Sequence, residues 1–144
     1  MTAATRCPKC GAKAVRPRQR AGRTMRFRNI LALPIPADFP IPTCGRCAAE
    51  YLGPATCDRL APLLLCSYQA ALRIAGSKLV NQATANISQR KLERLLGVSQ
   101  GYLSRIKAQD GQPSSILVAL LHLLAQPGAA ASLERFFAFL PSLE

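Results

Sequence analysis

The chain has 144 residues, 49% of them hydrophobic, which is enough apolar material for one compact domain or two small ones and excludes a disordered chain. Nineteen Lys and Arg against seven Asp and Glu give a net charge of +12 and favour a polyanionic partner, whether DNA, RNA or an acidic protein. No apolar run approaches the roughly 18 residues that cross a bilayer, and arginines and two cysteines occupy the region where a signal peptide would be apolar. We therefore expect a cytoplasmic protein with no membrane partner.

Two Cys-x-x-Cys pairs, Cys7 with Cys10 and Cys44 with Cys47, are the strongest chemical signal in the chain. Each pair is expected to form a tight knuckle whose backbone N–H groups point at sulfur, so that two facing knuckles place four thiolates around one structural metal ion. Zinc is the default occupant, one per chain, although iron can enter the same four-sulfur site. The alternatives are two disulfides, which a reducing cytosol disfavours, and a thioredoxin-like redox pair, which the lack of a βαβ pattern disfavours.

Between the two pairs, the sequence predicts short strands at 14–19 and 24–28 joined by a turn, followed by an irregular, proline-rich return at 33–42. We expect a zinc ribbon over residues 1–54, a β-hairpin with two zinc knuckles whose core is too small to fold without the metal. The predicted hairpin must expose six arginines: Arg16, Arg18, Arg20, Arg23, Arg26 and Arg28. They are candidates for contacting DNA phosphates or an acidic protein, and the alternative is a merely solvated basic face.

Residues 55–144 predict a second, all-α domain of about five helices, so the expected fold class is α+β. The first helix is long, is expected to be capped by Thr56 or Asp58, and should end before a loop at 81–86. Pro62 is tolerable only if it lies in the first turn of that helix.

Residues 88–107 predict two short helices joined by a glycine turn, the pattern of a helix-turn-helix. Ser88 is expected to cap the first helix, Gly97 to close it in the left-handed conformation, and Ser99 to cap the second. The candidate DNA contacts are Gln89, Arg90, Ser99, Gln100, Gly101, Tyr102, Ser104, Arg105 and Lys107. The alternative is an ordinary helical hairpin with a polar outer face.

The last part of the chain predicts an apolar helix at 116–125 that must be covered on all sides, and a final helix at 133–140 with surplus aromatic surface. Such surplus commonly supports dimerisation in small helical DNA-binding domains. Two cysteines outside the knuckles, Cys57 and Cys66, and the one histidine, His122, are each expected to be packed in a core rather than to bind a metal.

The stretch from Ser88 to Lys107 resembles the helix-turn-helix of the Xre and phage-repressor family. The match comprises the leading Gln89, the turn Leu-Gly-Val-Ser and the apolar positions Leu92, Leu96, Val98, Leu103 and Ile106. That family has a small residue where this chain has Glu93, so we expect the carboxylate of Glu93 to turn outward, towards Arg90 or Arg94.

The order of the whole chain, a Cys-Pro-x-Cys and Cys-x-x-Cys ribbon followed by an Xre-like domain, resembles the MqsA antitoxins, also described as YgiT-type zinc-finger proteins. Leu-Ser-Arg at 103–105 and Gln-Pro-Ser at 112–114 are similar as well. The resemblance implies a dimer that binds an operator through its C-terminal domain and neutralises a partner ribonuclease through its zinc domain. It also implies that Arg105 reads a base, whereas Gly101 replaces a base-reading asparagine, so the operator sequence does not transfer.

We therefore predict a homodimeric, sequence-specific transcriptional regulator, a repressor, that binds an inverted-repeat operator in double-stranded DNA and carries one structural zinc ion. The alternative is an antitoxin that neutralises a toxin protein through its zinc domain and regulates its own operon. Neither a nucleophile–base pair nor an open metal site is evident in the sequence, and the chain has no Trp and one His, so no enzyme is predicted.

Overall fold

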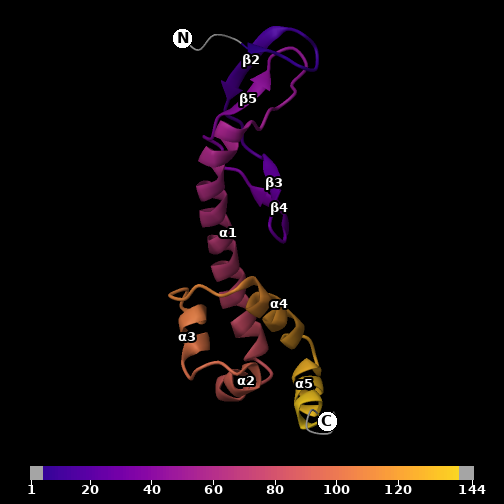
Figure 1. Cartoon of the computed structure of the whole chain (residues 1–144). Helices are drawn as coiled ribbons and strands as arrows, with labels where there is room; N and C mark the ends of the chain where they lie inside the picture. Colours follow the sequence, from indigo (N-terminus) through magenta and orange to yellow (C-terminus); the bar gives the residue numbers. More distant parts are fainter. Residues whose placement is uncertain (1–4, 140–144) are drawn as a thin grey trace. The chain divides into compact units, whose positions relative to one another are not determined.

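The computed structural model describes residues 5–139 and has the α+β architecture that the sequence predicts (Figure 1). A small antiparallel β region comes first, and five helices follow it within the described residues. The chain divides into two compact units, Met1–Tyr68 and Gln69–Glu144, called unit 1 and unit 2 below. This division falls inside the first helix, and the predicted domain boundary at residues 54 and 55 lies where that helix begins.

Unit 1 contains two antiparallel sheets. Strands β1 (Thr5–Arg6), β2 (Lys13–Arg18) and β5 (Ile41–Cys44) form the first sheet, in the order β1-β2-β5. Strands β3 (Thr24–Phe27) and β4 (Ile30–Pro34) form the second.

The predicted pairing of the strands at 14–19 and 24–28 is therefore wrong. β2 pairs with β5, with Val15 opposite Cys44, and β3 pairs with β4. The proline-rich return is also more regular than expected, because β4 and β5 occupy its two ends. Pairing β2 with β5 brings the second knuckle beside the strand that follows the first, so the sheet itself assembles the cysteines.

Helix α1 spans Pro54–Ala83, 30 residues, and buries Leu60, Leu64 and Tyr68 in unit 1. In the same unit the Tyr68 hydroxyl donates to Asn29 Oδ1 at 2.7 Å. Two expectations about α1 are wrong. It begins before Thr56, which places Pro62 beyond the first turn, and it extends into the predicted loop at 81–86.

The cysteines of α1 are exposed, which corrects the expectation that they are buried. Cys66 lies two residues from both Leu64 and Tyr68, which turns it away from the buried stripe because residues that share a helix face are three or four apart. Cys57 lies in the first turn, and its thiol donates to the carbonyl of Leu52 at 3.7 Å.

Unit 2 contains the end of α1 and four shorter helices, α2 (Gln89–Leu96), α3 (Tyr102–Lys107), α4 (Ser115–Leu124) and α5 (Ala129–Phe139). Their common core comprises Val80, Ala83, Leu92, Leu103, Ile106, Leu121 and Leu124. Ser88 caps α2 by accepting from the Lys91 N–H group, as expected, and Ser114 caps α4 in the same way.

Gly76 lies where α1 closely approaches α3 and Pro113. A Cβ atom at this position would lie 3.1 Å from Ile106 Cγ2 and 3.1 Å from Pro113 Cγ, closer than nearly all real Cβ contacts. Since Ile106 belongs to α3, the missing side chain lets α3 pack directly against α1.

Helix α4 is not covered on all sides, contrary to expectation. Ile116 is 79% exposed and Leu123 is 60% exposed, and His122 is exposed beside them rather than packed in the core. The aromatic surplus of α5 is present: Phe136, Phe137 and Phe139 are all exposed, whereas the predicted Leu140 lies outside the described residues.

Within residues 5–139, no single helix combines the length and hydrophobicity needed to cross a bilayer. Helices α4 and α5 reach that composition only as a pair that is bent by 109°.

Candidate metal centre and nucleic-acid interface

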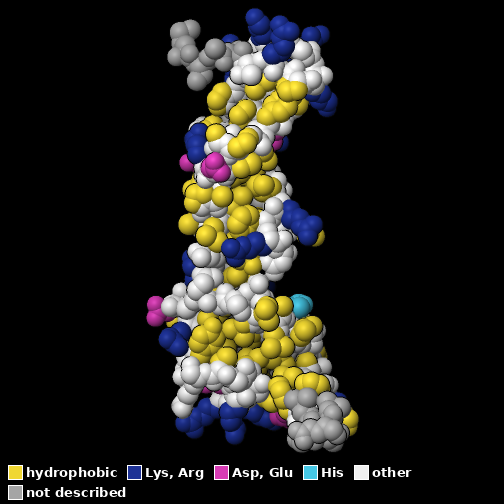
Figure 2. Space-filling view, in the orientation of Figure 1, with side chains coloured by type: hydrophobic (Ala, Val, Ile, Leu, Met, Phe, Trp, Pro, Cys, Tyr) yellow, Lys and Arg dark blue, Asp and Glu magenta, His cyan; other side chains and the backbone are white. Residues whose placement is uncertain are grey.

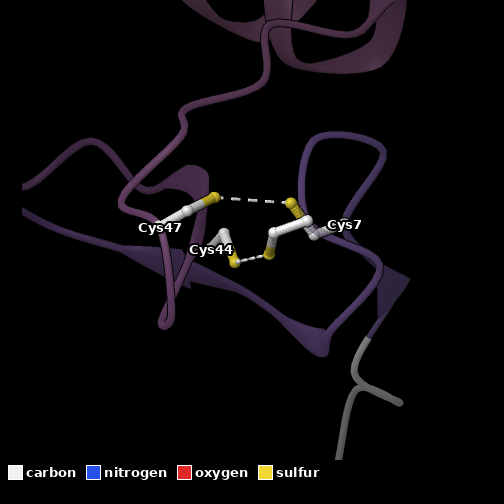
Figure 3. A group of neighbouring side chains, drawn as sticks. Cys7, Cys44 and Cys47 are labelled. Atoms are coloured by element: carbon white, nitrogen blue, oxygen red, sulfur yellow. Dashed lines mark hydrogen bonds between the residues drawn. The ribbon is translucent and has the colours of Figure 1, made fainter.

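The four knuckle cysteines lie together in unit 1, with all four Sγ atoms within 4.8 Å of one another. Cys7 Sγ is 3.6 Å from Cys47 Sγ, and Cys10 Sγ is 3.7 Å from Cys44 Sγ, so each close pair joins one knuckle to the other. In Figure 3 the side chains of Cys7, Cys44 and Cys47 point inward from two facing loops. The predicted cysteine cluster is thus confirmed, and the four residues could hold one metal ion.

The sulfur positions fit a tetrahedral metal site. Zinc–sulfur bonds of about 2.3 Å put the corners of a tetrahedron about 3.8 Å apart. The Cys7–Cys47 and Cys10–Cys44 separations are close to this value. A disulfide needs about 2.05 Å between sulfurs, and all four residues are free thiols. The donor set therefore matches a closed four-sulfur site in which no coordination position is left for substrate.

Backbone and side-chain donors around the cluster favour thiolates at two of the four positions. The Tyr51 hydroxyl, 3.0 Å from Cys7 Sγ, is the main cause that lowers the pKa of Cys7 to about 6. The N–H groups of Cys47 and Arg46 lower the pKa of Cys44. By contrast, the pKa of Cys10 rises to about 12, because burial and the neighbouring thiols outweigh the Ala12 N–H group that lowers it.

Tyr51 was not singled out from the sequence, although it lies only four residues after Cys47. Its hydrogen bond to Cys7 and its burial raise the pKa of Tyr51 to about 12, so the phenol stays a donor to sulfur. A hydroxyl that donates to a ligand atom orients the ligand and disperses its charge.

The six arginines expected on one exposed face do not share one environment. Arg23 is buried: its guanidinium donates to Glu50 Oε1 at 2.9 Å, to the Arg18 carbonyl and to Thr43 Oγ1. The expectation that all six face solvent is therefore wrong for Arg23, because Glu50 and two further acceptors satisfy its charge and its donors. The other five are exposed, namely Arg16, Arg18, Arg20, Arg26 and Arg28.

In unit 2, the carboxylate of Glu93 joins α2 to α3. Glu93 is 3% exposed, and its Oε1 accepts from the N–H groups of Gly101 at 3.0 Å and Leu103 at 3.2 Å. Gln89 Nε2 donates to the same oxygen at 3.1 Å and to Ser104 Oγ at 2.7 Å. The outward orientation expected for Glu93 is wrong, since the unpaired N–H groups at the start of α3 bind the carboxylate inside.

This arrangement also corrects the predicted cap of the second helix. Gly101, with φ 81°, precedes α3 and Ser99 makes no side-chain cap, because Glu93 already occupies those N–H groups. Gly97 closes α2 in the left-handed conformation as expected, with φ 66°, and the N–H of Val98 reaches back to the Glu93 carbonyl.

The residues predicted to contact DNA differ in their exposure to solvent. Leu103 and Ile106 of α3 are fully buried, which leaves the opposite side of that helix to solvent. Exposed positions are Arg90, Ser99, Gln100, Ser104, Arg105 and Lys107, while Gln89, Gly101 and Tyr102 are half-buried. The Arg105 guanidinium lies 5.7 Å from the Tyr102 ring centre. Figure 2 shows Lys and Arg side chains gathered at the end of unit 2 that carries α2 and α3.

No protein-family model, curated protein or solved structure matches this chain. The resemblance to MqsA antitoxins and to Xre-type domains stays a prediction from the motifs.

Proposed function

We propose that the chain is a sequence-specific, DNA-binding transcriptional regulator in which α2 and α3 form a helix-turn-helix and unit 1 is a zinc ribbon. One observation carries the proposal. The buried Glu93 carboxylate fixes the start of α3 against α2, and the buried Leu103 and Ile106 pack the other side of α3 into the core. The polar side of α3 is therefore held as a rigid exposed surface. A rigid helix with exposed polar side chains fits the major groove of DNA.

Within this proposal, Arg105 reads a base and its neighbours position the helix. A guanidinium can donate two hydrogen bonds to O6 and N7 of guanine, which distinguishes guanine from the other bases in the major groove. Arg90 and Lys107 are exposed cations on α2 and α3 and would contact phosphates. Gln89 Nε2 donates to Glu93 and to Ser104, and on DNA it would exchange the exposed Ser104 bond for a bond to a phosphate oxygen.

In unit 1 the proposed occupant of the four-sulfur cluster is zinc. A closed site of four thiolates suits a structural ion, and zinc is the common metal with this ligand set and geometry. Its role is to stabilise the two knuckles and the first sheet, where Cys7, Val15 and Cys44 form a small buried cluster.

The test first uses the purified protein to select a preferred operator sequence from a pool of random-sequence duplexes. Arg105→Ala should weaken binding to the selected operator by about 1–3 kcal/mol and binding to random DNA much less. Arg135→Ala removes an exposed arginine from α5 and serves as the matched control. Equal losses on operator and random DNA for Arg105→Ala would refute base reading.

Gln89→Ala should weaken operator and random DNA alike, because phosphate contacts carry no sequence information. A loss confined to the operator would contradict this division of roles.

The alternative function, an antitoxin that neutralises a toxin through unit 1, rests on the motif resemblance. Co-purification with the product of an adjacent gene would support it.

A further inference from the structure

Unit 1 carries a basic surface on the side of β2 and the second knuckle. Two adjoining hollows, of about 430 Å³ and 230 Å³, share Arg18, Gly45 and Arg46. Lys13, Ala14 and Arg16 complete the larger one. We call the two together the basic hollow. Figure 2 shows dark blue side chains clustered at the end of unit 1 that carries β2 and β5.

The cations of the basic hollow lack anionic partners. Within the described residues, the side chains of Lys13, Arg16, Arg18 and Arg46 form no ion pair or hydrogen bond. The one acid in the lining is Glu50, and it is already matched by Arg23 at 2.9 Å and Arg20 at 3.6 Å. Four unpaired cations on one concave surface repel each other, and their potential attracts anions.

The local backbone brings these cations together from two segments of the chain. Arg16 and Arg18 alternate along β2, so they share one face of that strand, while Arg46 belongs to the knuckle after β5. The N–H of Gly45 donates to the Ala14 carbonyl at 2.8 Å, which fixes the knuckle against β2. Gly45 has no side chain to displace Arg18, whose Nη2 would lie 3.2 Å from a Cβ there. The Sγ atoms of Cys7, Cys10, Cys44 and Cys47 lie together between the same two knuckles.

We propose that the basic hollow binds the phosphodiester backbone of double-stranded DNA without regard to sequence. Guanidinium groups match phosphate with paired, charge-assisted hydrogen bonds, and three of the four unpaired cations are arginines. The lining contains no aromatic or large aliphatic side chain. Protein partners usually need such an apolar anchor, and single strands need an aromatic surface for stacking, whereas duplex backbone needs neither.

This site is separate from the α2–α3 surface, and its test must not depend on base reading. The assay therefore uses full-length, metal-loaded protein and a 30-base-pair duplex of random sequence, in the natural chain and again with Arg105→Ala. Arg18→Gln/Arg46→Gln removes the two arginines common to both hollows. The matched control, Arg26→Gln/Arg135→Gln, removes two exposed arginines elsewhere with the same change in net charge.

The dissociation constant is measured against salt concentration. Each lost phosphate contact lowers the log–log salt slope by about 0.9, so the double variant should lose about 1.8 and bind on the order of fiftyfold more weakly near 0.1 M salt. Adding Arg16→Gln should remove about 0.9 more. The control should change the slope much less. Arg18→Lys/Arg46→Lys keeps both charges and should keep the slope, which separates lost charge from altered folding.

Three results would overturn the proposal. An unchanged slope in Arg18→Gln/Arg46→Gln would show that the basic hollow does not contact the duplex. An equal decrease in the Arg26→Gln/Arg135→Gln control would mean that net charge alone acts. Loss of binding to polyglutamate with an unchanged duplex slope would identify an acidic protein as the partner. If the helix-turn-helix fails to read an operator, the slope in the Arg105→Ala background still decides the question for unit 1.

Discussion

Arg20 and Arg23 approach the same carboxylate oxygen of Glu50 from different surroundings. The Arg23 side chain is 3% exposed and makes two further hydrogen bonds, whereas the Arg20 side chain is 65% exposed and lies 3.6 Å from the oxygen. Ion pairs in water contribute little, because solvent screens them and the side chains lose freedom. A buried guanidinium, once removed, leaves its acceptors without donors.

Arg23→Met should therefore lower the free energy of unfolding of unit 1 by about 2–3 kcal/mol. This is less than the loss of a fully buried ion pair costs, because Glu50 is partly exposed and water can replace one donor. Arg20→Met should cost less than about 0.5 kcal/mol. Hydrogen exchange measured on peptides of unit 1 compares the two variants in the metal-loaded protein. Similar effects from both would contradict the difference in burial.

Serine substitutions at Cys44 and Cys57 compare a cysteine inside the cluster with one outside it. Cys44→Ser should abolish stoichiometric metal binding, because three thiolates leave the site open, and residues 1–54 should lose their fold with the metal. Cys57→Ser should keep one metal ion per chain, since Cys57 lies outside the cluster. Metal analysis of the two purified proteins with circular dichroism decides this. A Cys44→Ser protein in which residues 1–54 stay folded without metal would contradict the coupling.

At the scale of elements, α3 is too short to stabilise itself and depends on Glu93 for its first turn. Isolated helices of six residues are unstable in water, and the carboxylate satisfies two N–H groups there while favouring the positive end of the helix. The orientation of the polar face of α3 thus depends on a residue of α2.

Glu93→Ala should lower the free energy of unfolding of unit 2 by about 2–3 kcal/mol, because the buried N–H of Leu103 and the half-buried N–H of Gly101 lose their acceptor. Glu93→Gln keeps an acceptor oxygen and should cost about 1 kcal/mol. The exposed Asp110 provides the control, and Asp110→Ala should stay within about 0.5 kcal/mol. Denaturant unfolding measures all three. Equal costs for Glu93→Ala and Asp110→Ala would disprove the capping role.

Local sequence patterns predicted the individual turns and helices better than they predicted which elements contact one another. The Cys-x-x-Cys spacing predicted the cluster, and Ser88 and Gly97 marked the limits of α2, because turns and caps depend on neighbouring residues. Strand pairing depends on residues far apart in the chain, so the pairing of β2 with β5 was missed.

Errors at single residues have a similar cause. The apolar segments around Cys66 and His122 assigned both residues to a core, and the small residue that the resembled family has at position 93 assigned the Glu93 carboxylate to solvent. Cys66 and His122 turned out to lie on exposed faces, and Glu93 is buried because donors from α3 surround its carboxylate. Burial of a polar side chain follows from its partners, which a single sequence does not reveal.

At the scale of the whole molecule, the apolar surface of α4 and α5 predicts a homodimer. Ile116 and Leu123 on α4 and Phe136 on α5 are all more than half exposed. Apolar surface of this kind on a small protein commonly marks an interface. Under the proposed function, dimerisation through these helices would place the α3 helices of the two copies about 34 Å apart. This spacing matches an inverted repeat whose half-sites lie one turn of the DNA helix apart.

Sedimentation should therefore show a dimer at micromolar concentration. Ile116→Asp should shift the protein to monomer, because a charge buried in an apolar interface is costly. Leu31→Asp, at a side chain of unit 1 that is 74% exposed, should leave the dimer intact. A natural chain that sediments as a monomer, with or without DNA, would rule the dimer out.

The close contact at Gly76 has a genetic consequence. Alanine there would favour the helix by about 1 kcal/mol over glycine, but it would press on Ile106 of α3 and on the ring of Pro113. Relief requires a small shift of α3 that alters none of its exposed side chains. Gly76→Ala should therefore lower the thermal stability of unit 2, and under the proposed function such an allele would control its target genes at low growth temperature and release them when the culture is warmed.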